Sequence, residues 1–337
     1  MKEKRNQIIK ACVIILIIYA LSVGILAAIS DLKQIDVGTP DAAAADWMST
    51  LPDDKSIAVL SIPGTHDSAT KYSPFNYSFQ CQTTSVTEQL MMGYRFMDIR
   101  IKLKETKDGT VNMYLMHGIG HCKNSDGSYM TFEDFEKECL DFLTEHPGET
   151  IIVLVDAATS RNKNASSVSD TLQNYLSTHS DRWYQKNEIP TLGETRGKLI
   201  LATRYGDVND IGSDLCGWDL EWISQSSRTM PRETVIKYSL NGNLDAFCVQ
   251  NWFKISVKNK EKAVHDALDG EFTSTDTLLI NYLSISTEIL FLPCPKLRAI
   301  KINEDFMNYE FTKGKSYGIV LVDFGTAEMA KKVYETN

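Results

Sequence analysis

The chain lacks several features that mark common classes of protein. Its net charge is −9, so it has no basic excess of the kind that binds nucleic acid or adheres to anionic lipid by charge alone. Its seven cysteines include no CxxC pair, which disfavours a structural zinc site, and their wide spacing leaves any disulfide pairing open. No tandem repeat is present. The 337 residues, 43% of them hydrophobic, suffice for one large domain with a single core.

The first thirty residues hold a long apolar run. Basic residues precede an uncharged stretch from Ala11 to Ile29. As a helix this stretch would span roughly 28 Å, close to the thickness of a bilayer core. The basic flank predicts that the first ten residues stay in the cytoplasm and that the remainder is exported. The segment is either an uncleaved anchor or a signal peptide cleaved near Ser30.

We therefore divide the chain into three parts. Residues 1–30 form the transmembrane anchor or signal peptide. Residues 31–46, which contain Gly38, Pro40 and a run of alanines, are predicted to be a linker. Residues 47–337 are predicted to be one folded domain, extracellular and tethered to the cell membrane by a single span, or secreted if the N-terminal segment is removed.

Apolar, β-rich runs alternate with helical stretches along the folded domain. We expect strands at Ile57–Ile62, Arg95–Leu103, Asn112–Met116, Thr150–Val155, Lys198–Thr203, Ala246–Gln250, Thr277–Tyr282 and Gly318–Val322. Helices are expected at Val86–Met92, Phe132–Glu145, Val168–Thr178, Lys258–Leu268 and Arg298–Asn308. About eight buried strands separated by helices predict an α/β fold with an irregular (β/α)8 barrel. A doubly wound open sheet competes, but no glycine-rich fingerprint follows the first strand.

Reactive side chains fall at the ends of the expected strands. They are His66, Asp67, Arg100, His117, Arg204, Asn251 and Asp323. In a barrel these strand ends meet on one face, where such enzymes keep their active sites. The positions therefore predict an active site built from several distant segments.

The residue types suit chemistry at a phosphodiester. His66 and His117 could act as one base and one acid, because one oxygen must lose a proton and another must gain one. An arginine binds phosphate through its planar fork of donors. Asp67 and Asp323 could each orient one imidazole and stabilise its protonated form.

Plainer interpretations stay open for some of these residues. His117, His121 and Cys122 could be metal ligands, although no further ligand with suitable spacing accompanies them. Arg204 could belong to a strand-end ion pair. Asp156 could be a catalytic acid, but an ordinary strand-end carboxylate is the favoured interpretation.

Six short motifs occur in the same order as in a known family. They are SIPGTHDS at 61–68, FMDIR at 96–100, MHG at 116–118, HPGETII at 146–152, GKLILATRY at 197–205 and VDF at 322–324. From about Trp47 to its end, the chain resembles the bacterial phosphatidylinositol-specific phospholipases C, which have a distorted (β/α)8 barrel. Each motif is weak alone, but six in order across one barrel make a strong resemblance.

The resemblance implies a role for each catalytic candidate. His66 would be the general base that activates the inositol 2-hydroxyl, held by Asp323. His117, assisted by Asp67, would be the general acid that protonates the departing diacylglycerol oxygen. Arg100 would occupy the role that calcium has in metal-dependent relatives, so we expect neither a metal nor another cofactor. The products would be diacylglycerol and inositol 1,2-cyclic phosphate.

The headgroup pocket departs from the family pattern. Arg204 matches the family arginine that binds inositol hydroxyls, but Asp156 stands where the family has a lysine. Asn251 and Phe253 replace the family's Asp and Tyr. We expect a monomer acting on phosphatidylinositol in a membrane surface, with little activity on phosphorylated inositides and with glycosylphosphatidylinositol left open as a substrate.

Aromatic residues crowd the segment after the first expected strand, namely Tyr72, Phe75, Tyr77 and Phe79. They either meet the bilayer interface or cap the barrel. Two other functions stay open. One is a metal-dependent barrel phosphodiesterase of glycerophosphodiesters or sphingolipids. The other is a non-catalytic relative that binds inositol lipid or glycan, which the altered pocket at Asp156 and Asn251 allows.

Overall fold

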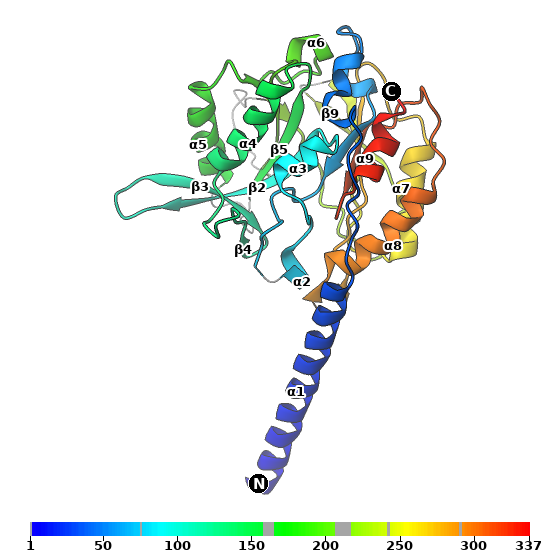
Figure 1. Cartoon of the computed structure of the whole chain (residues 1–337). Helices are drawn as coiled ribbons and strands as arrows, with labels where there is room; N and C mark the ends of the chain where they lie inside the picture. The colour runs from blue at the N-terminus through cyan, green and yellow to red at the C-terminus, as the bar shows by residue number, and fades with distance from the viewer. Residues whose placement is uncertain (1, 75, 158–164, 206–216, 241–242, 290–291) are drawn as a thin grey trace.

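A curved, mainly parallel sheet with helices on its outside forms the folded domain (Figure 1). The computed structural model describes residues 2–74, 76–157, 165–205, 217–240, 243–289 and 292–337. The main parallel strands, in their order of pairing, are β7 (Leu199–Arg204), β5 (Ile151–Ala157), β2 (Phe96–Glu105), β1 (Ile62–Thr65), β14 (Ile319–Val322), β11 (Leu278–Tyr282) and β10 (Asn243–Gln250). Because β1 pairs with β14, strands from the two ends of the domain sequence lie side by side.

Shorter strands border this sheet. Two of them pair in parallel with β7, namely β6 (Trp183–Tyr184) and β8 (Trp218–Asp219). Antiparallel additions are β9 (Ile236–Leu240) on β10, β3 (Val111–His117) on β2, and β4 (Gly120–His121) on β3. A separate hairpin consists of β12 (Glu288–Ile289) and β13 (Leu292–Pro293). Within the described residues no pairing joins β9 to β6 or β8, so the barrel is open on that side.

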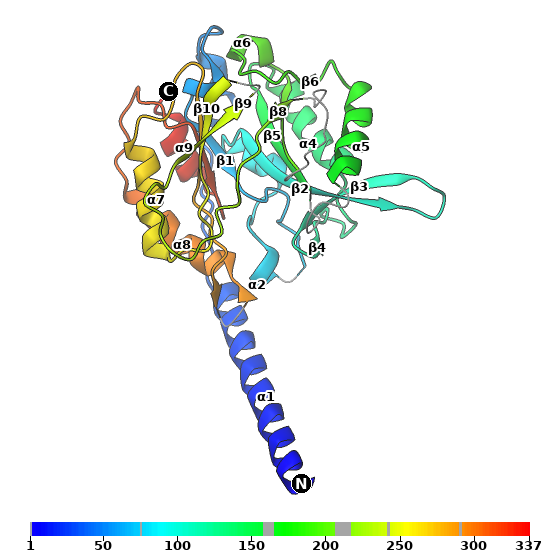
Figure 2. The same ribbon diagram turned by 180° about the vertical axis from the view of Figure 1, so that it is seen from behind.

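Helices cover the outside of the sheet, with α4 and α5 on one flank and α7, α8 and α9 on the other (Figures 1 and 2). The α-helices are α1 (Lys2–Leu32), α2 (Asn76–Phe79), α3 (Val86–Met91), α4 (Phe132–Glu145), α5 (Ala165–Ser177), α6 (Leu192–Thr195), α7 (Val257–Asp269), α8 (Pro295–Asn308) and α9 (Ala327–Tyr334). The 3₁₀ helices are η1 (Ala44–Asp46), η2 (Met48–Thr50) and η3 (Ile57–Val59).

Most predicted elements are confirmed, some to the residue. The predicted helix Phe132–Glu145 is α4, which begins at a capping box formed by Thr131 and Asp134. Helices α3, α5, α7 and α8 and strands β2, β5, β7, β10, β11 and β14 also lie where the sequence predicted them. The barrel-like α/β architecture is therefore confirmed, with one open side.

Two predicted barrel strands are wrong. The buried run Ile57–Ile62 begins as η3, because the Ser56 hydroxyl accepts a hydrogen bond from the Ala58 amide at 3.3 Å and starts a helical turn. The first strand starts only at Ile62. The predicted strand Asn112–Met116 does exist, but it is β3 and runs antiparallel to β2 as a hairpin outside the parallel set. Neither of these two runs is therefore the parallel barrel strand that its composition predicted.

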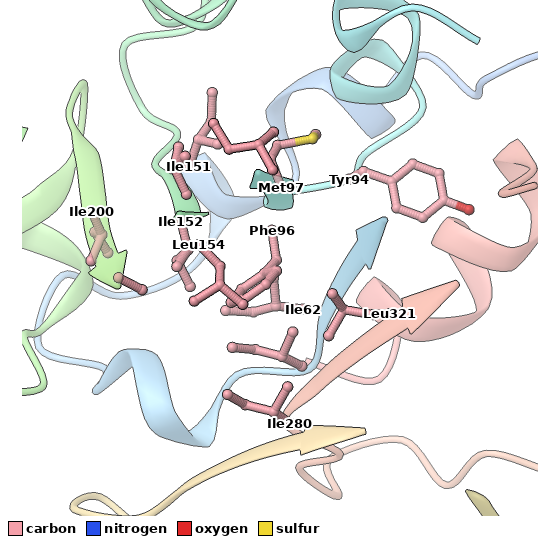
Figure 3. Packing of buried hydrophobic residues seen from close by; sticks show 14 of the residues in the cluster. Ile62, Tyr94, Phe96, Met97, Ile151, Ile152, Leu154, Ile200, Ile280 and Leu321 are labelled. Carbon is pink, nitrogen blue, oxygen red and sulfur yellow. The ribbon is translucent and has the colours of Figure 1, made fainter. Parts of the chain in front are cut away.

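The barrel interior is filled by aliphatic and aromatic side chains. Ile62, Phe96, Leu154, Ile280 and Leu321, which come from five different strands, meet at the centre of Figure 3 and are each at most 1% exposed. Each of these five strands supplies one of the five side chains, so the packing of the interior depends on every strand being in register. This packing fixes the strand ends that carry the site.

A buried ion pair lies near the start of β2. The Arg95 Nε donates to Glu149 Oε2 at 2.9 Å, and both side chains have no exposed surface. Arg95 also donates to the carbonyl of Ala45 at 2.7 Å, and Glu149 accepts from the Ser49 amide at 2.8 Å. Ala44 and Ala45 are buried as well, so the end of the predicted linker 31–46 packs against the domain.

Removing one partner of this pair should destabilise the protein strongly. We expect Glu149→Gln to lower the free energy of unfolding by about 3–5 kcal/mol, because it leaves the buried Arg95 guanidinium without its counter-charge. Urea unfolding of the purified protein measures the change. Glu145→Gln, at the exposed end of α4, is the control and should stay within about 0.5 kcal/mol of the parent. A loss below 1 kcal/mol for Glu149→Gln would contradict the prediction.

Helix α1 extends away from the barrel (Figures 1 and 2). Its segment Lys4–Leu32 is long and apolar enough to cross a membrane, by length and composition, and a signal sequence has the same properties. Large aliphatic side chains such as Leu16 and Leu21 are more than 60% exposed on it. The chain therefore has an N-terminal apolar helix that could serve as an anchor or as a signal.

Candidate active site

The predicted site residues come together at the carboxyl ends of the parallel strands. Eight of the nine line one cavity of about 330 Å³, namely His66, Arg100, His117, Asp156, Arg204, Asn251, Phe253 and Asp323. Asp67, the ninth, is buried beside the cavity and is 2% exposed. A larger hollow of about 650 Å³, bordered by Lys71, Glu88 and Lys137, contains none of them and has no comparable grouping of histidine and arginine.

A tight turn after β1 positions His66 and Asp67. Asp67 has a φ of +44°, in the left-handed region that Asp tolerates better than most residues. The Gln82 side-chain amide donates to the His66 carbonyl at 2.9 Å and to the Val322 carbonyl at 2.8 Å. Gln82 thereby ties the ends of β1 and β14 together. Its role had no signal in the sequence, because Gln82 lies in a segment without periodicity.

His66 lies between two carboxylates. Its Nδ1–H donates to Asp323 Oδ1 at 2.7 Å, and its Nε2 is 3.1 Å from Asp67 Oδ2. Burial opposes protonation of His66, but Asp67 and Asp323 outweigh it and raise the pKa of His66 to about 9. Since Asp323 holds Nδ1, Nε2 is the atom that gains or loses a proton.

His117 reaches the same carboxylate from the end of the β2–β3 hairpin. Its Nδ1–H donates to the Phe79 carbonyl at 2.8 Å, and its Nε2 is 3.2 Å from Asp67 Oδ2. Burial is the main reason that the pKa of His117 lies below its ordinary value, and Asp67 opposes this shift. The ring centroids of His66 and His117 are 6.3 Å apart. The sequence thus placed His117 in the right site but on a strand of the wrong direction.

Asp67 also binds the arginine of β2. Arg100 Nε is 3.2 Å from Asp67 Oδ1, and its Nη2 donates to Asp67 Oδ2 at 3.4 Å. Asp67 is buried, which opposes its ionisation, but Arg100 and the two imidazoles prevail and lower its pKa to about 2. One carboxylate therefore contacts both imidazoles and the guanidinium.

A metal interpretation has a limited basis here. His66, Asp67 and Cys81 bring potential ligand atoms within 4.8 Å of one another. However, Asp67 already pairs with Arg100, whose positive charge opposes a divalent cation at this point. The predicted alternative of His117, His121 and Cys122 does not form such a group in the described part of the chain, where the His121 ring stacks on Tyr129 at 4.1 Å.

The other side of the cavity carries an ordered row of charges. Arg100, Asp156 and Arg204 are in register on the adjacent strands β2, β5 and β7. Arg204 Nη1 donates to Asp156 Oδ2 at 3.2 Å, so the strand-end ion pair considered for Arg204 exists. The guanidinium also lies 4.2 Å from the Trp222 ring. Sequence analysis missed Trp222, which follows a short strand and has no motif around it.

Tyr282 is a third residue that the sequence did not single out. It ends β11, its ring centroid is 5.9 Å from that of His66, and its hydroxyl donates to Asp98 Oδ2 at 3.3 Å. Burial raises the pKa of Asp98 to about 7. Tyr282 thus packs edge-on against the imidazole of His66. Its place at the end of a predicted strand was the available signal.

The aromatic side chains of the segment after β1 lie in different environments. Phe79 lines the cavity and packs edge-on against His117, with ring centroids 6.0 Å apart. Tyr77 is buried, while Tyr72 is 41% exposed. Phe75 lies outside the described residues.

The comparisons agree with this fold and with the resemblance that the motifs predicted. Residues 61–205 match the family described as phosphatidylinositol-specific phospholipase C, X domain. The chain is 25% identical over 304 residues to 1-phosphatidylinositol phosphodiesterase of Listeria monocytogenes, covering 86% of this chain and 84% of the relative. It is 27% identical over 257 residues to the protein of the same name from Staphylococcus aureus strain Newman, covering 72% and 75%.

Solved structures show the same fold. A phosphatidylinositol-specific phospholipase C from Staphylococcus aureus with incorporated pentafluoro-Phe superposes with a TM-score of 0.67 at 21% identity, covering 88% of this chain and 98% of that one. The Listeria monocytogenes phosphatidylinositol-specific phospholipase C gives 0.63 at 22% identity, covering 87% and 98%.

Fold and site define an open-barrel protein with a two-histidine, one-arginine centre at its strand ends. The comparisons support the resemblance to bacterial phosphatidylinositol-specific phospholipases C that the motifs predicted.

Proposed function

We propose that the protein is a phosphatidylinositol-specific phospholipase C. It cleaves phosphatidylinositol to diacylglycerol and inositol 1,2-cyclic phosphate. The observation that carries this proposal is that one buried carboxylate, Asp67, contacts His66, His117 and Arg100, all three of which line one cavity. The printed names of the relatives, 1-phosphatidylinositol phosphodiesterase, support the same substrate.

In the proposed mechanism each histidine transfers one proton. His66 accepts a proton from the substrate, and His117 donates a proton to the leaving group. His66 Nε2 takes the proton of the inositol 2-hydroxyl while that oxygen bonds to phosphorus. The bond from phosphorus to the diacylglycerol oxygen breaks, and His117 Nε2 gives its proton to that oxygen. Asp323 orients His66 through the 2.7 Å bond to Nδ1. The nucleophile belongs to the substrate itself, which removes much of the entropic cost of attack.

Arg100 is proposed to bind the phosphate and to stabilise the negative charge that develops on it. Its acidic neighbours keep the guanidinium charged, since Asp67 above all raises the pKa of Arg100 and outweighs the opposing effect of burial. A fixed cation at this point performs the charge stabilisation for which related enzymes use calcium. The reaction therefore needs no metal or other cofactor.

The inositol ring is proposed to bind among Arg204, Asp156, Asn251 and Phe253. Arg204 Nε is buried without a hydrogen-bond partner in the described part of the chain, so it can donate to a ring hydroxyl. Asp156 can accept from another hydroxyl and repels a phosphate on the ring. We expect unphosphorylated phosphatidylinositol to be preferred, with glycosylphosphatidylinositol a further possible substrate.

The test uses the full chain with phosphatidylinositol in detergent mixed micelles and excess EDTA. Phosphorus NMR should show a cyclic phosphodiester forming without added metal. Turnover that requires calcium would contradict the role of Arg100 and favour a metal-dependent phosphodiesterase. Binding of the lipid without turnover in either condition would favour a non-catalytic relative.

The pH dependence of cleavage should report the histidine pair. One proton must be present on the pair, so kcat/KM should follow a bell-shaped curve. Below the lowered pKa of His117 both rings are protonated and no base remains. Above the raised pKa of His66, about 9, no proton remains for the leaving group. We expect the alkaline limb near pH 9 and the acidic limb below pH 6.5.

Asp323→Asn should move one limb of this curve. Removing one of the two carboxylates beside His66 lowers its pKa, so the alkaline limb should fall by about one to three pH units. Asp305→Asn, which alters a carboxylate paired with His265 between α7 and α8, is the matched control and should leave the curve unchanged. An unmoved alkaline limb in Asp323→Asn would show that His66 does not set it.

The protein is proposed to act outside the cytoplasmic membrane, as a monomer. Residues 1–30 anchor it, and the barrel lies on the exported side, because the basic residues precede the apolar run. Cleavage of the segment would instead release the barrel as a secreted enzyme.

A further inference from the structure

One face of α1 is covered by the folded domain. The residues of this face follow helical spacing, and five of them, Tyr19, Ser22, Val23, Leu26 and Ala27, are half-buried while Ser30 is buried. Ser30 is only 2% exposed, whereas its neighbours Ile25 and Ile29 are 61% and 42% exposed. This spacing follows the turn of the helix, so a single stripe of α1 is in contact with the domain.

The surface that covers this stripe is the rim of the active-site cavity. Tyr19 lies close enough to Tyr77 of α2 to interact with it, and the buried Ser30 lies beside the buried Cys294 at the start of α8. The same segments line the cavity through Ser78, Phe79, Pro293 and Pro295. Helix α1 therefore joins the domain at the mouth of the site (Figures 1 and 2).

The segment that follows α1 is attached to the barrel along its length. The Ala327 amide donates to the Val37 carbonyl at 2.8 Å, and Lys331 pairs with Asp41 at 2.7 Å. The bond from Arg95 to the Ala45 carbonyl fixes the end of the segment. Both α9 and the start of β2 thus hold it, and it crosses the outside of the barrel from the cavity end to the opposite end (Figure 1). It is a strap rather than a free tether, so the direction of α1 is fixed relative to the cavity.

Two exposed aliphatic side chains lie on the same rim. Ile119 is 85% exposed and follows Gly118, which lines the cavity. Ile223 is 78% exposed and precedes Ser224, which also lines it. Exposed aliphatic groups beside a lipid-cleaving site suit contact with a bilayer. Because the net charge of the protein is −9, electrostatic attraction to anionic lipid cannot hold it at a membrane, so apolar contacts have to supply the binding free energy.

The place of the contact stripe along α1 determines how deep the cavity rim lies in the membrane. The covered stripe from Tyr19 to Ser30 corresponds to roughly 17 Å of helix, and the apolar run from Ala11 to Ile29 to roughly 28 Å. The rim therefore lies beside the outer half of the membrane-spanning run. The phosphodiester of an outer-leaflet lipid lies just beyond the outer end of this run, at the level of Ser30.

We propose that docking of α1 on the cavity rim holds the active site in the outer leaflet of the membrane that α1 spans. The enzyme then cleaves lipids of its own membrane in preference to those of any other. This inference rests on the proposed function and on retention of α1. It assigns the helix a second role, that of orienting the catalytic domain in addition to anchoring it.

A disulfide tests the docking without reference to activity. Ser30→Cys is made in a Cys12→Ser background and reconstituted in phosphatidylcholine vesicles that contain phosphatidylinositol. Mild oxidation should link Cys294 to position 30 in most molecules, as shown by the cross-linked peptide in mass spectrometry. Ala28→Cys, on the exposed face of α1, is the matched control and should not form the link. Equal cross-linking of the two variants would overturn the docking.

A two-vesicle assay tests the consequence. Protein reconstituted in vesicles with one labelled phosphatidylinositol is mixed with protein-free vesicles that carry another label. We expect cleavage in the protein's own vesicles to be at least about tenfold faster, and oxidised Ser30→Cys to keep this rate within about twofold. Equal rates in both populations would overturn the inference and leave the proposed function intact. Absence of cleavage in both, and in mixed micelles, would contradict the proposed function, while the cross-link still reports on the docking.

Discussion

Replacing His117 with alanine is expected to lower kcat by about 10²–10⁴-fold while leaving the fold intact. In the proposed mechanism the variant lacks the acid that protonates the diacylglycerol oxygen, since His66, the other imidazole beside Asp67, serves as the base. Turnover of phosphatidylinositol in micelles measures the loss, and circular dichroism with urea unfolding checks the fold.

His66→Ala should have an effect of similar size. The double variant should be little worse than either single one, since the two residues act as one unit. His265→Ala is the matched control, because His265 pairs with Asp305 on the outside of the barrel and should retain parental turnover. Full activity in either active-site variant would remove that histidine from the mechanism.

Arg100→Ala is expected to lower kcat by about 10²–10³-fold, the usual cost of removing a donor that stabilises developing negative charge. The change also removes the main group that keeps Asp67 ionised, so the pKa of Asp67 should rise from about 2. A less well-ionised Asp67 would then orient both imidazoles less well. Micellar turnover measures the effect, with excess EDTA present throughout.

Two further variants separate charge from geometry at this position. Arg100→Lys keeps the positive charge but loses the planar fork, so it should recover only part of the rate. Arg228→Ala, which removes an exposed arginine paired with Glu288, should behave as the parent. If Arg100→Ala were as active as the parent in EDTA, the arginine mechanism would be wrong.

The grouping of the candidate site residues was predictable because short motifs and strand ends carry these residues. His66, Asp67 and Asp323 directly follow the parallel strands β1 and β14, and Arg100 lies within β2. Parallel strands in a barrel bring such positions together whatever the detailed packing. His117 reaches the cavity by a route that the sequence did not predict, because β3 is a hairpin partner of β2 and its end returns to the same cavity.

Other features depended on contacts that leave no local pattern. The sequence offered no reason to place Trp222 beneath Arg204, or to make Gln82 join β1 to β14. The run at Ile57–Ile62 had the composition of a buried strand, and one hydroxyl at Ser56 turned its start into η3. In each case a single long-range or side-chain contact decided the outcome.

The sequence by itself determined the apolar N-terminal helix, the alternation of strands and helices, and the choice of nine candidate site residues, whose roles stay a prediction. These follow from periodicity, composition and motifs, which act over a few neighbouring residues. Only the tertiary structure decided that Asp67 serves both imidazoles and Arg100, and that α1 rests on the cavity rim through Ser30. Such contacts join residues far apart in the chain, and they exist only once the barrel has brought those residues together.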